Sequence, residues 1–227
     1  AAKLNSHIED IDLNLEDFVA RVNSDLIGKF INIASRAAGF IQKRFAGELS
    51  STLAPHALLT RLQAAAQPLA IAYETREYSR AMREIMGLAD AVNQFVDEEK
   101  PWVLAKDPTQ GERLQQTCSI LLNAFRLLSL YLKPVLPKLA QQVEAFLQIA
   151  PLTWADSQSL LTAQRILPYQ HLMTRIEASQ IAALVDANKQ SLHAAPAPIA
   201  APPAIAPIAD SIQLDDFLKV DLRIAKI

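Results

Sequence analysis

The sequence predicts an all-α protein, and two observations support this fold class. Of the 227 residues, 51% are hydrophobic and 20% are charged, a balance that allows a real core and separates the chain from disordered sequences. Through most of residues 1–193, apolar residues recur at steps of three and four, as they do on one face of an α-helix. We find no internal repeat of fixed period, so a helical bundle is favoured over a solenoid.

The first predicted helix is the most regular. Asn14 is a good N-cap, and Glu16 and Asp17 follow in the first turn, where carboxylates interact favourably with the helix dipole. We expect the helix to end near Gly47. One face carries a continuous apolar stripe, formed by Val19, Val22, Leu26, Phe30, Ala34, Ala37, Ile41 and Phe45. The opposite face carries Lys29, Asn32, Arg36 and Lys43.

Further apolar periods follow along the chain. They predict helices at about 56–73, 76–99 and 112–132, a helix that resumes after Pro134 and Pro137 and runs through Leu147, and a last helix at about 174–193. Residues 148–170 contain Pro151 and Pro168 and are predicted to be loop and short turns.

The C-terminal part has a different composition. Residues 194–210 are almost entirely Ala, Pro and Ile, and their five prolines predict a semi-rigid linker rather than a membrane helix. Beyond the linker, apolar and polar residues alternate over 212–217 and 220–224, which predicts the opening strands of a second domain. Because the chain starts at Ala1 and stops within this alternation, we expect it to be a piece of a longer protein.

Composition excludes several classes of chemistry. The five glycines include no two at G-x-G spacing, so the sequence lacks the glycine-rich phosphate loops of dinucleotide and P-loop sites. The single cysteine, Cys118, lies among apolar residues and is expected to be buried. The histidines are scattered without metal-ligand spacing, and no Ser, Cys or Lys has a recognisable base partner. We therefore predict neither a metal site nor a catalytic site in this chain.

The net charge of −2 hides a segregation of charge along the chain. Residues 1–20 sum to −4, whereas residues 21–44 sum to +4. The basic block is therefore the first place to look for an anionic partner. Its candidates for contacts with phosphate groups are Lys29, Lys43 and Arg44.

Asn32 and Arg36 are four residues apart and hence neighbours on one helix face. Amide and guanidinium groups both form forked hydrogen bonds with the edges of flat heterocycles. The pair is therefore a candidate for binding a nucleobase. Spacing alone leaves open the alternative that the two side chains form an ordinary solvated helix face.

A second candidate lies at the end of the helix predicted at 76–99. Pro101 ends that helix and starts another, which places Trp102 at a corner where its ring can stack on a nucleobase. Asn93 and Asp97 form a polar pair on the helix face that leads to this corner. Two alternatives stay open, namely that Trp102 is a core anchor and that the polar pair is a solvated helix end.

Several segments resemble the bacterial methionyl-tRNA synthetase family. The first of them resemble the junction that leaves the family's catalytic half and the first helix of its anticodon-binding domain, and they comprise residues 7–18, 22–23 and 32–41. The similarity continues through 83–86, 93–97, 101–102 and 131–137. Residues 217–224 resemble the entry to the OB-fold tRNA-binding domain of the longer members.

The resemblance implies an all-α bundle of the class I aminoacyl-tRNA synthetase anticodon-binding type, followed by a disordered linker and a truncated OB-fold start. The implied domains are a junction from the absent catalytic domain at 1–13, the helical anticodon-binding domain at 14–150, a C-terminal extension with the last helix at 151–193, the Ala/Pro linker at 194–210 and the start of the OB-fold tRNA-binding domain at 211–227.

In that family an exposed tryptophan stacks on the anticodon, while an asparagine and an arginine of the first helix bind base edges. The residues implied to bind the anticodon are therefore Asn32, Arg36 and Trp102, joined by Asn93, Asp97 and Pro101. At Ala37 the chain departs from the family, which often has a polar residue there. Because Ala37 lies on the apolar stripe, this departure concerns packing rather than recognition.

The implied parent enzyme attaches methionine to tRNA using ATP. Its nucleotide-binding motifs and zinc-binding insertion do not occur in this chain, which implies that the chain alone is inactive and needs no cofactor, whereas the parent uses ATP with Mg and a zinc site. The implied partners are the CAU anticodon loop of methionine tRNA and the catalytic half of the same enzyme. The parent is implied to be a cytoplasmic homodimer without membrane contact. The alternative is a helical structural or protein-docking module without RNA binding of its own.

Overall fold

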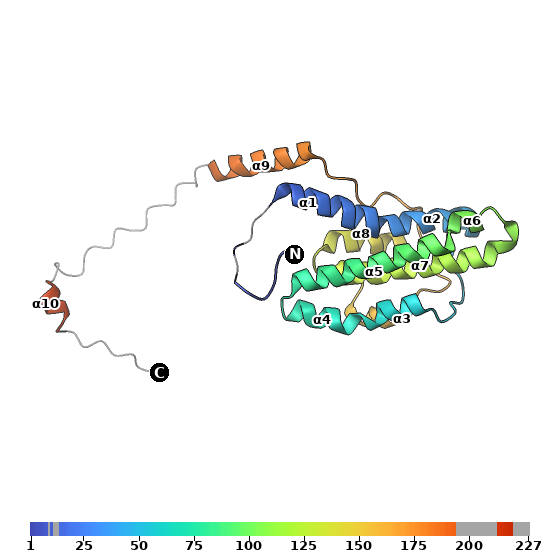
Figure 1. Ribbon diagram of the computed structural model, residues 1–227, viewed down its shortest axis with the longest axis horizontal. Helices are drawn as coiled ribbons and strands as arrows, with labels where there is room; N and C mark the ends of the chain where they lie inside the picture. The colour runs from blue at the N-terminus through green and yellow to red at the C-terminus, as the bar shows by residue number, and fades with distance from the viewer. Residues whose placement is uncertain (9, 11–13, 194–212, 220–227) are drawn as a thin grey trace. The chain divides into compact units, whose positions relative to one another are not determined.

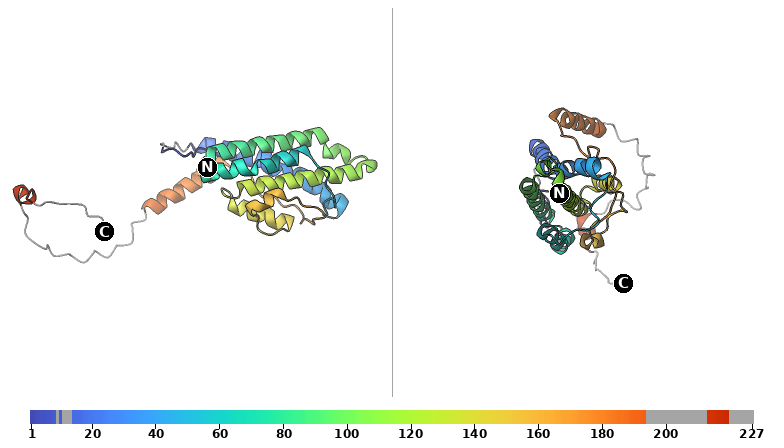
Figure 2. Two further views of the ribbon diagram at one scale, coloured as in Figure 1. Left: turned by 90° about the horizontal axis from the view of Figure 1, so that it is seen from below. Right: turned by 90° about the vertical axis from the view of Figure 1, so that its right-hand side faces the viewer.

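The computed structural model describes residues 1–8, 10, 14–193 and 213–219. The chain divides into two compact units, Ala1–Ile181 and Ala182–Ile227. The first unit is a bundle of helices that run close to one common direction, which confirms the predicted all-α class (Figures 1 and 2). Its elements in chain order are α1 (Leu15–Arg21), the π-helix η1 (Val22–Ile31), α2 (Asn32–Phe45), α3 (Ala57–Ala64), α4 (Ala66–Glu74), α5 (Tyr78–Glu99), α6 (Pro101–Leu104), the 3-10 helix η2 (Pro108–Gln110), α7 (Gly111–Leu132), α8 (Pro137–Leu147) and the 3-10 helix η3 (Trp154–Gln158).

The elements α1, η1 and α2 follow one another without a break and form what we call the long N-terminal helix, residues 15–45. As predicted, Asn14 caps it, because the Asn14 side chain accepts a hydrogen bond of 2.9 Å from the backbone N–H of Asp17. The helix ends at Phe45, since Ala46 (φ 49°) and Gly47 (φ 81°) both take left-handed backbone conformations.

The π-helical middle of the long N-terminal helix is a departure from the predicted α-helix. Val22, Leu26, Phe30 and Ala34 are each four residues apart, and at 100° per residue such a stripe drifts by about 40° per repeat in an α-helix. The wider turn of a π-helix, with its i→i+5 hydrogen bonds, turns the chain less per residue. Phe30 and Ala34 are both buried, so the stripe still faces the core where the helix changes from π to α.

The core of the first unit is built around α7. Residues 117–132 of this helix are all buried, because α2, α3, α5 and α8 pack against it. Phe30 of η1 stacks on Phe125 of α7, with ring centroids 4.7 Å apart. Cys118 lies in the same stretch, as predicted, and its burial raises the pKa of the thiol to about 12. The inward face predicted for α5 is also confirmed, with Ala81, Ile85, Leu88, Val92 and Val96 all buried.

The helix predicted at 56–73 is interrupted. It is divided at Ala65 into α3 and α4, and Pro68 lies in the first turn of α4. A proline has no N–H to donate, and its ring clashes with the carbonyl group four residues earlier, here that of Ala64. A single uninterrupted helix through this segment is therefore disfavoured.

The segment after α8 follows the surface of the bundle as loop and short turns, as predicted for 148–170. Polar side chains of α7 hold it in place. Asn123 donates from Nδ2 to the carbonyl oxygen of Leu161 (3.0 Å) and accepts from its N–H (2.6 Å). Buried Arg126 donates to the carbonyl oxygens of Asp156 (2.9 Å) and Ser159. One isolated β-bridge joins Arg165 to Glu48.

The last predicted helix is present as α9 (Ala178–His193), four residues shorter at its start than expected. The predicted linker at 194–210 and the alternating residues 220–224 lie outside the described residues. The strand predicted at 212–217 is wrong where the structure describes it, because Leu214–Phe217 form a helical turn, α10. Asp215 and Asp216 lie in the first turn of α10, where carboxylates stabilise a helix. In the part of the chain that the structure describes, every helix is too short or too polar to cross a membrane.

Candidate nucleic-acid interface

The long N-terminal helix and α5 lie side by side, and polar contacts connect them at a constant register. Lys29 pairs with Asp90 (2.9 Å), and Arg36 pairs with Asp97 (3.2 Å). Beyond the end of α5, Arg44 donates to the carbonyl oxygen of Ala105 (2.7 Å). Each contact joins residues 61 positions apart, so the two segments run parallel with matched helical turns.

The corner between α5 and α6 forms as predicted. Lys100 takes a left-handed conformation with φ 46°, which ends α5, and Pro101 occupies the first position of α6. Pro101 is buried, whereas Trp102 is 40% exposed and Val103 is 50% exposed. Since its ring is partly accessible, Trp102 is not a core anchor. The corner therefore presents an indole and an isopropyl group to solvent, at the end of the bundle where α2 also ends (Figure 1).

Arg36 connects the two predicted candidate groups. Its Nη1 lies 3.2 Å from Oδ1 of Asp97, and its guanidinium carbon lies 5.9 Å from the centroid of the Trp102 ring. The latter distance is within the range of a cation–π interaction. The structure thus brings Arg36, Asp97 and Trp102 together from three helices.

Asn32 is the first residue of α2 and lies one helical turn before Arg36. The Ser35 hydroxyl lies 2.9 Å from the backbone carbonyl oxygen of Asn32 and 3.2 Å from its carboxamide Oδ1, so its single proton is shared between these two acceptors. Among the described residues, Nδ2 of Asn32 has no hydrogen-bond partner. A carboxamide oxygen has two lone pairs, so Oδ1 can accept a second hydrogen bond.

Asn93 has a structural role that the sequence does not reveal. Its Nδ2 donates to the carbonyl oxygens of Ala89 (2.9 Å) and Lys29 (3.2 Å). The second bond fastens α5 to the π-helix η1, whose carbonyl groups do not follow the regular α-helical pattern. The predicted contact of Asn93 with an anticodon stays a prediction, and it would use the Oδ1 atom. Pro101 likewise stays a predicted contact, and its burial gives it a part in shaping the corner.

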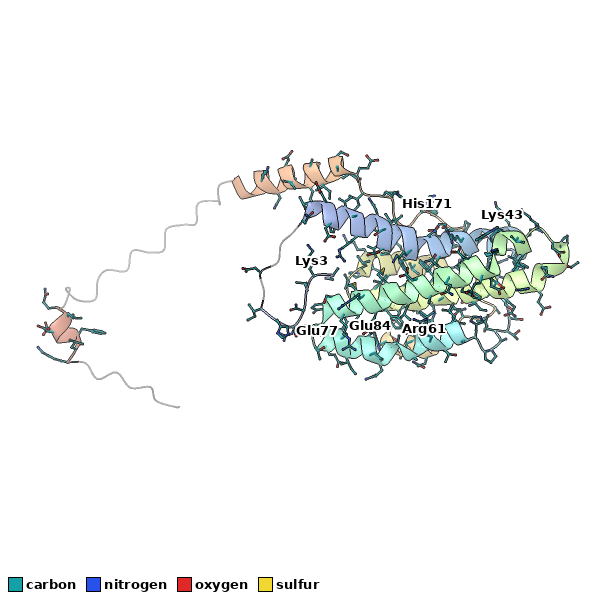
Figure 3. All side chains as sticks on the ribbon, viewed as in Figure 1. Lys3, Lys43, Arg61, Glu77, Glu84 and His171 are labelled. Carbon is teal, nitrogen blue, oxygen red and sulfur yellow. The ribbon has the colours of Figure 1, made fainter. Side chains whose placement is uncertain are left out.

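The three predicted phosphate contacts differ in their surroundings. Lys29 pairs with Asp90 and lies 3.9 Å from Asp25, and Arg44 is bonded to the backbone of Ala105. Lys43 is exposed on the outer surface of α2, near α6 (Figure 3). Of the three, Lys43 is therefore the residue best placed to meet a phosphate group without breaking a contact within the described residues.

Two residues near the site were missed. Asp90 shares the i, i+3, i+7 face of α5 with Asn93 and Asp97, and this spacing was the signal that could have found it. Val103 adds exposed apolar surface beside Trp102. The sequence gives only a weak signal for Val103, since an apolar residue after Pro-Trp is equally compatible with a buried position.

Charged groups behind the corner hold its framework. The Glu99 carboxylate accepts hydrogen bonds from Arg113 (3.2 Å), which raises the pKa of that guanidinium. The Asp107 carboxylate accepts from the hydroxyl and the N–H of Thr109, and these bonds lower the pKa of Asp107. The first pair joins the end of α5 to α7, and the second lies in the turn between α6 and α7.

The chemistry available at this corner is binding. An aromatic ring can stack on a flat heterocycle, and the amide and guanidinium groups beside it can donate to and accept from the edge of that heterocycle. Within the described residues, no group of three or more His, Cys, Asp or Glu side chains could hold a metal ion.

The chain is similar to known proteins. Residues 45–192 match a family described as the anticodon binding domain of methionyl tRNA ligase. The chain is 60% identical over its whole length to a methionine–tRNA ligase of Chromobacterium violaceum and 53% identical to one of Neisseria meningitidis serogroup C. It spans about a third of the length of these curated relatives, 33% in both cases.

The fold is also similar to solved structures. The apo form of the methionyl-tRNA synthetase of Mycobacterium tuberculosis matches 73% of this chain and 35% of its own, with a TM-score of 0.67 and 21% sequence identity. The same synthetase in complex with methionyl-adenylate matches 70% of this chain and 33% of its own, with a TM-score of 0.64 and 23% identity.

Proposed function

The chain belongs to the family of methionyl-tRNA ligase anticodon-binding domains, and on this premise we propose that it binds the CAU anticodon loop of methionine tRNA. The observation that carries the proposal is the meeting of Arg36 with the partly exposed ring of Trp102 at one corner, with Asn32 one helical turn before Arg36. The conclusion concerns binding and discrimination, since the chain covers the anticodon-binding region and not the catalytic domain.

The Trp102 ring supplies a stacking surface. Proteins recognise single-stranded RNA loops by splaying the bases onto aromatic side chains, and each stacked base contributes about 1–3 kcal/mol. The guanidinium carbon of Arg36 already lies 5.9 Å from the ring centroid. A base that stacks on Trp102 therefore comes within reach of the Arg36 donors.

Asn32 and Arg36 supply the hydrogen bonds that distinguish one base from another. The Watson–Crick edge of cytosine carries an exocyclic amine, which donates, beside two acceptors. Oδ1 of Asn32 can accept from the amine, while the guanidinium of Arg36 donates to the acceptors. Asp97 holds Arg36 at 3.2 Å and so reduces the side-chain entropy lost when the base binds.

Lys43 supplies a contribution to the binding free energy that does not depend on the RNA sequence. Its ammonium group is exposed on the same helix that carries Asn32 and Arg36 (Figure 3). Contacts of lysine with phosphate groups release counterions and weaken as the salt concentration rises. We assign Lys43 to the anticodon-stem phosphates, with Lys29 and Arg44 as secondary contacts whose present partners must be exchanged.

The proposal extends to the whole enzyme. The parent ligase attaches methionine to tRNA with ATP and Mg, carries a zinc site outside this chain, acts as a homodimer in the cytoplasm, and loses this activity when reduced to the present segment. These properties rest on family membership and not on contacts of the described residues.

An equilibrium titration with labelled RNA stem-loops tests the proposal. We expect the CAU loop to bind more tightly than a loop with an altered first anticodon base. Trp102→Ala should weaken binding of the CAU loop by about 1–3 kcal/mol through loss of stacking. Ile71 is 47% exposed on α4, away from the corner, so Ile71→Ala is the matched control and should leave binding unchanged.

The second candidate function, a helical docking module without RNA binding, gives a different result in this titration. Such a module would show no preference for the CAU loop, and Trp102→Ala would change binding by less than twofold. Either result would contradict the proposed function.

A further inference from the structure

Gly39 lies in the interior of α2, on its exposed surface. A glycine at such a position destabilises a helix relative to alanine, because its backbone loses more conformational entropy on folding. A Cβ atom added at Gly39 would meet no heavy atom within 4 Å among the described residues, apart from its chain neighbours and the backbone of its own helix. Packing therefore gives no reason for a glycine here.

The other glycines stand in different surroundings. Gly47 has φ 81°, and a Cβ atom there would lie 3.1 Å from a backbone carbonyl oxygen. A Cβ atom at Gly28 would lie 3.3 Å from another backbone carbonyl oxygen, and Gly111 is the first residue of α7, outside the helix interior. Gly87 of α5 has surroundings as open as those of Gly39. Open surroundings alone thus do not set Gly39 apart, whereas its position on the helix does.

Gly39 lies between the predicted base contacts and the predicted phosphate contact of α2. At about 100° per residue, Asn32, Arg36, Gly39 and Lys43 fall within about 60° of one another around the helix axis, so they share one face. Along the axis, at about 1.5 Å per residue, Gly39 is roughly 4.5 Å beyond Arg36 and roughly 6 Å before Lys43. A strand that reaches from Arg36 to Lys43 along this face has to pass Gly39.

We propose that the sugar–phosphate backbone of the bound anticodon loop crosses α2 at Gly39, in van der Waals contact with the backbone of the helix; this inference rests on the proposed function. A base that stacks on Trp102 and hydrogen-bonds to Arg36 is joined through its ribose to the phosphate groups that Lys43 attracts. Glycine lets a ligand approach a helix backbone more closely than any other residue does, since it has no side chain. Gly39 thus serves as a positioning residue for the RNA.

The closeness of this contact decides how well the base is recognised. Hydrogen bonds to a base edge require donor–acceptor distances of about 2.7–3.2 Å and weaken steeply when the geometry is lost. The side chain of Lys43, in contrast, is long and flexible and is able to follow a displaced strand. A side chain at position 39 would hold the strand away from α2. It would therefore reduce discrimination between bases, while the sequence-independent phosphate contact remains.

Gly39→Ala tests the crossing, with Gly87→Ala as the matched control. Gly87 is exposed in the interior of α5 and lies about 15 Å along that helix from Asp97. Both substitutions should raise the urea midpoint of unfolding, because alanine favours a helix and fits the open space at both positions. A gain in stability that accompanies a loss of binding is not expected of a residue with a merely structural role.

We expect Gly39→Ala to weaken binding of the CAU stem-loop by about fivefold or more, with the salt dependence of binding unchanged. Binding of a loop with an altered first anticodon base should fall less. Gly87→Ala should change binding of either loop by less than twofold.

A CAU affinity of Gly39→Ala within twofold of the wild type would overturn the proposal. So would a lowered urea midpoint for Gly39→Ala, which would show that the fold itself requires glycine at this position. A wild-type chain without a preference for the CAU loop would instead refute the proposed function, and the crossing would fall with it.

Modified RNA locates the crossing from the side of the ligand. CAU stem-loops that each carry a single 2′-O-methyl group at one loop nucleotide are titrated against the wild-type chain and against Gly39→Ala. A methyl group on the ribose that lies on Gly39 occupies the same space as the alanine methyl group, so the two losses of affinity should not multiply there. We expect such coupling at one or two adjacent nucleotides, whereas losses that multiply at every loop nucleotide would overturn the proposal.

Discussion

Arg126 and Arg36 have the same side chain in two contrasting regions of the bundle. Arg126 is 2% exposed on α7 and donates to backbone carbonyl oxygens of the segment that follows α8. Its burial lowers the pKa of the guanidinium. The side chain of Arg36 is 35% exposed, and its partners are the carboxylate of Asp97 and the ring of Trp102.

The two arginines differ in whether their hydrogen-bond partners can be exchanged for a ligand. Backbone carbonyl groups are fixed by the fold, so Arg126 can only hold the chain in place. Side-chain partners at a partly exposed site can exchange for the edge or face of a ligand at little cost. Comparing the partners of a polar group therefore separates residues that stabilise the fold from residues that bind, where residue type alone does not.

The largest expected effect is on stability. Arg126→Ala should lower the free energy of unfolding by about 2–5 kcal/mol, because it removes the packing of a buried side chain and its charged hydrogen bonds to two backbone carbonyl groups. Urea unfolding followed by circular dichroism measures this loss. Binding of the CAU loop by the folded fraction should not change.

Arg113→Ala is the matched control on the same helix. The Arg113 side chain is 58% exposed and pairs with Glu99, and such surface pairs contribute about 0–1 kcal/mol. Equal destabilisation by Arg113→Ala and Arg126→Ala would remove the basis of the comparison.

The next effect is on binding. Arg36→Ala should weaken binding of the CAU loop by about 1–3 kcal/mol. It should weaken binding of a loop with an altered first anticodon base less, because only the cognate base loses a forked contact to its Watson–Crick edge. The free energy of unfolding should change by less than about 1 kcal/mol, since the Arg36–Asp97 pair is exposed. Arg36→Lys keeps the positive charge but lacks the paired donors of the guanidinium, so it should not restore discrimination between the two loops. Equal losses for both loops would make Arg36 a mere phosphate contact.

The smallest effect is that of Lys43→Ala. It should weaken binding of all loops to a similar degree. The slope of the logarithm of the binding constant against the logarithm of the salt concentration should become shallower by about 1, as expected for one phosphate contact. Titrations at several salt concentrations measure the slope. A selective loss for the CAU loop would move Lys43 from the group of phosphate contacts to the group that binds base edges.

The two regions also differ in how far the sequence predicts them. The N-cap at Asn14, the apolar stripe of the first helix and the corner at Pro101 follow from local rules of capping, period and proline geometry. The same rules did not reveal η1, because its four-residue spacing is close to both helical periods. Pro68 was available in the sequence as a helix breaker, but the apolar period around it favoured one helix.

The sequence does not predict contacts between distant segments. The Arg36–Asp97 pair, the bond from Arg44 to Ala105 and the bond from Asn93 to Lys29 depend on the parallel register of α5 and the long N-terminal helix. Residue spacing fixes neighbours within one helix, whereas packing of the whole core fixes the register between helices. Spacing within single helices marked the candidate site residues, the family resemblance gave them their implied roles, and their contacts with RNA stay predictions.

Fluorescence of Trp102 tests the central claim most directly. The chain has two tryptophans, and Trp154→Phe leaves Trp102 as its single indole. Nε1 of Trp154 is buried without a hydrogen-bond partner among the described residues, so the replacement breaks no polar contact. If Trp102 stacks on an anticodon base, its emission should be quenched and should saturate with the CAU stem-loop at the affinity measured by titration. Saturating loop binding that leaves the Trp102 emission unchanged would contradict the account.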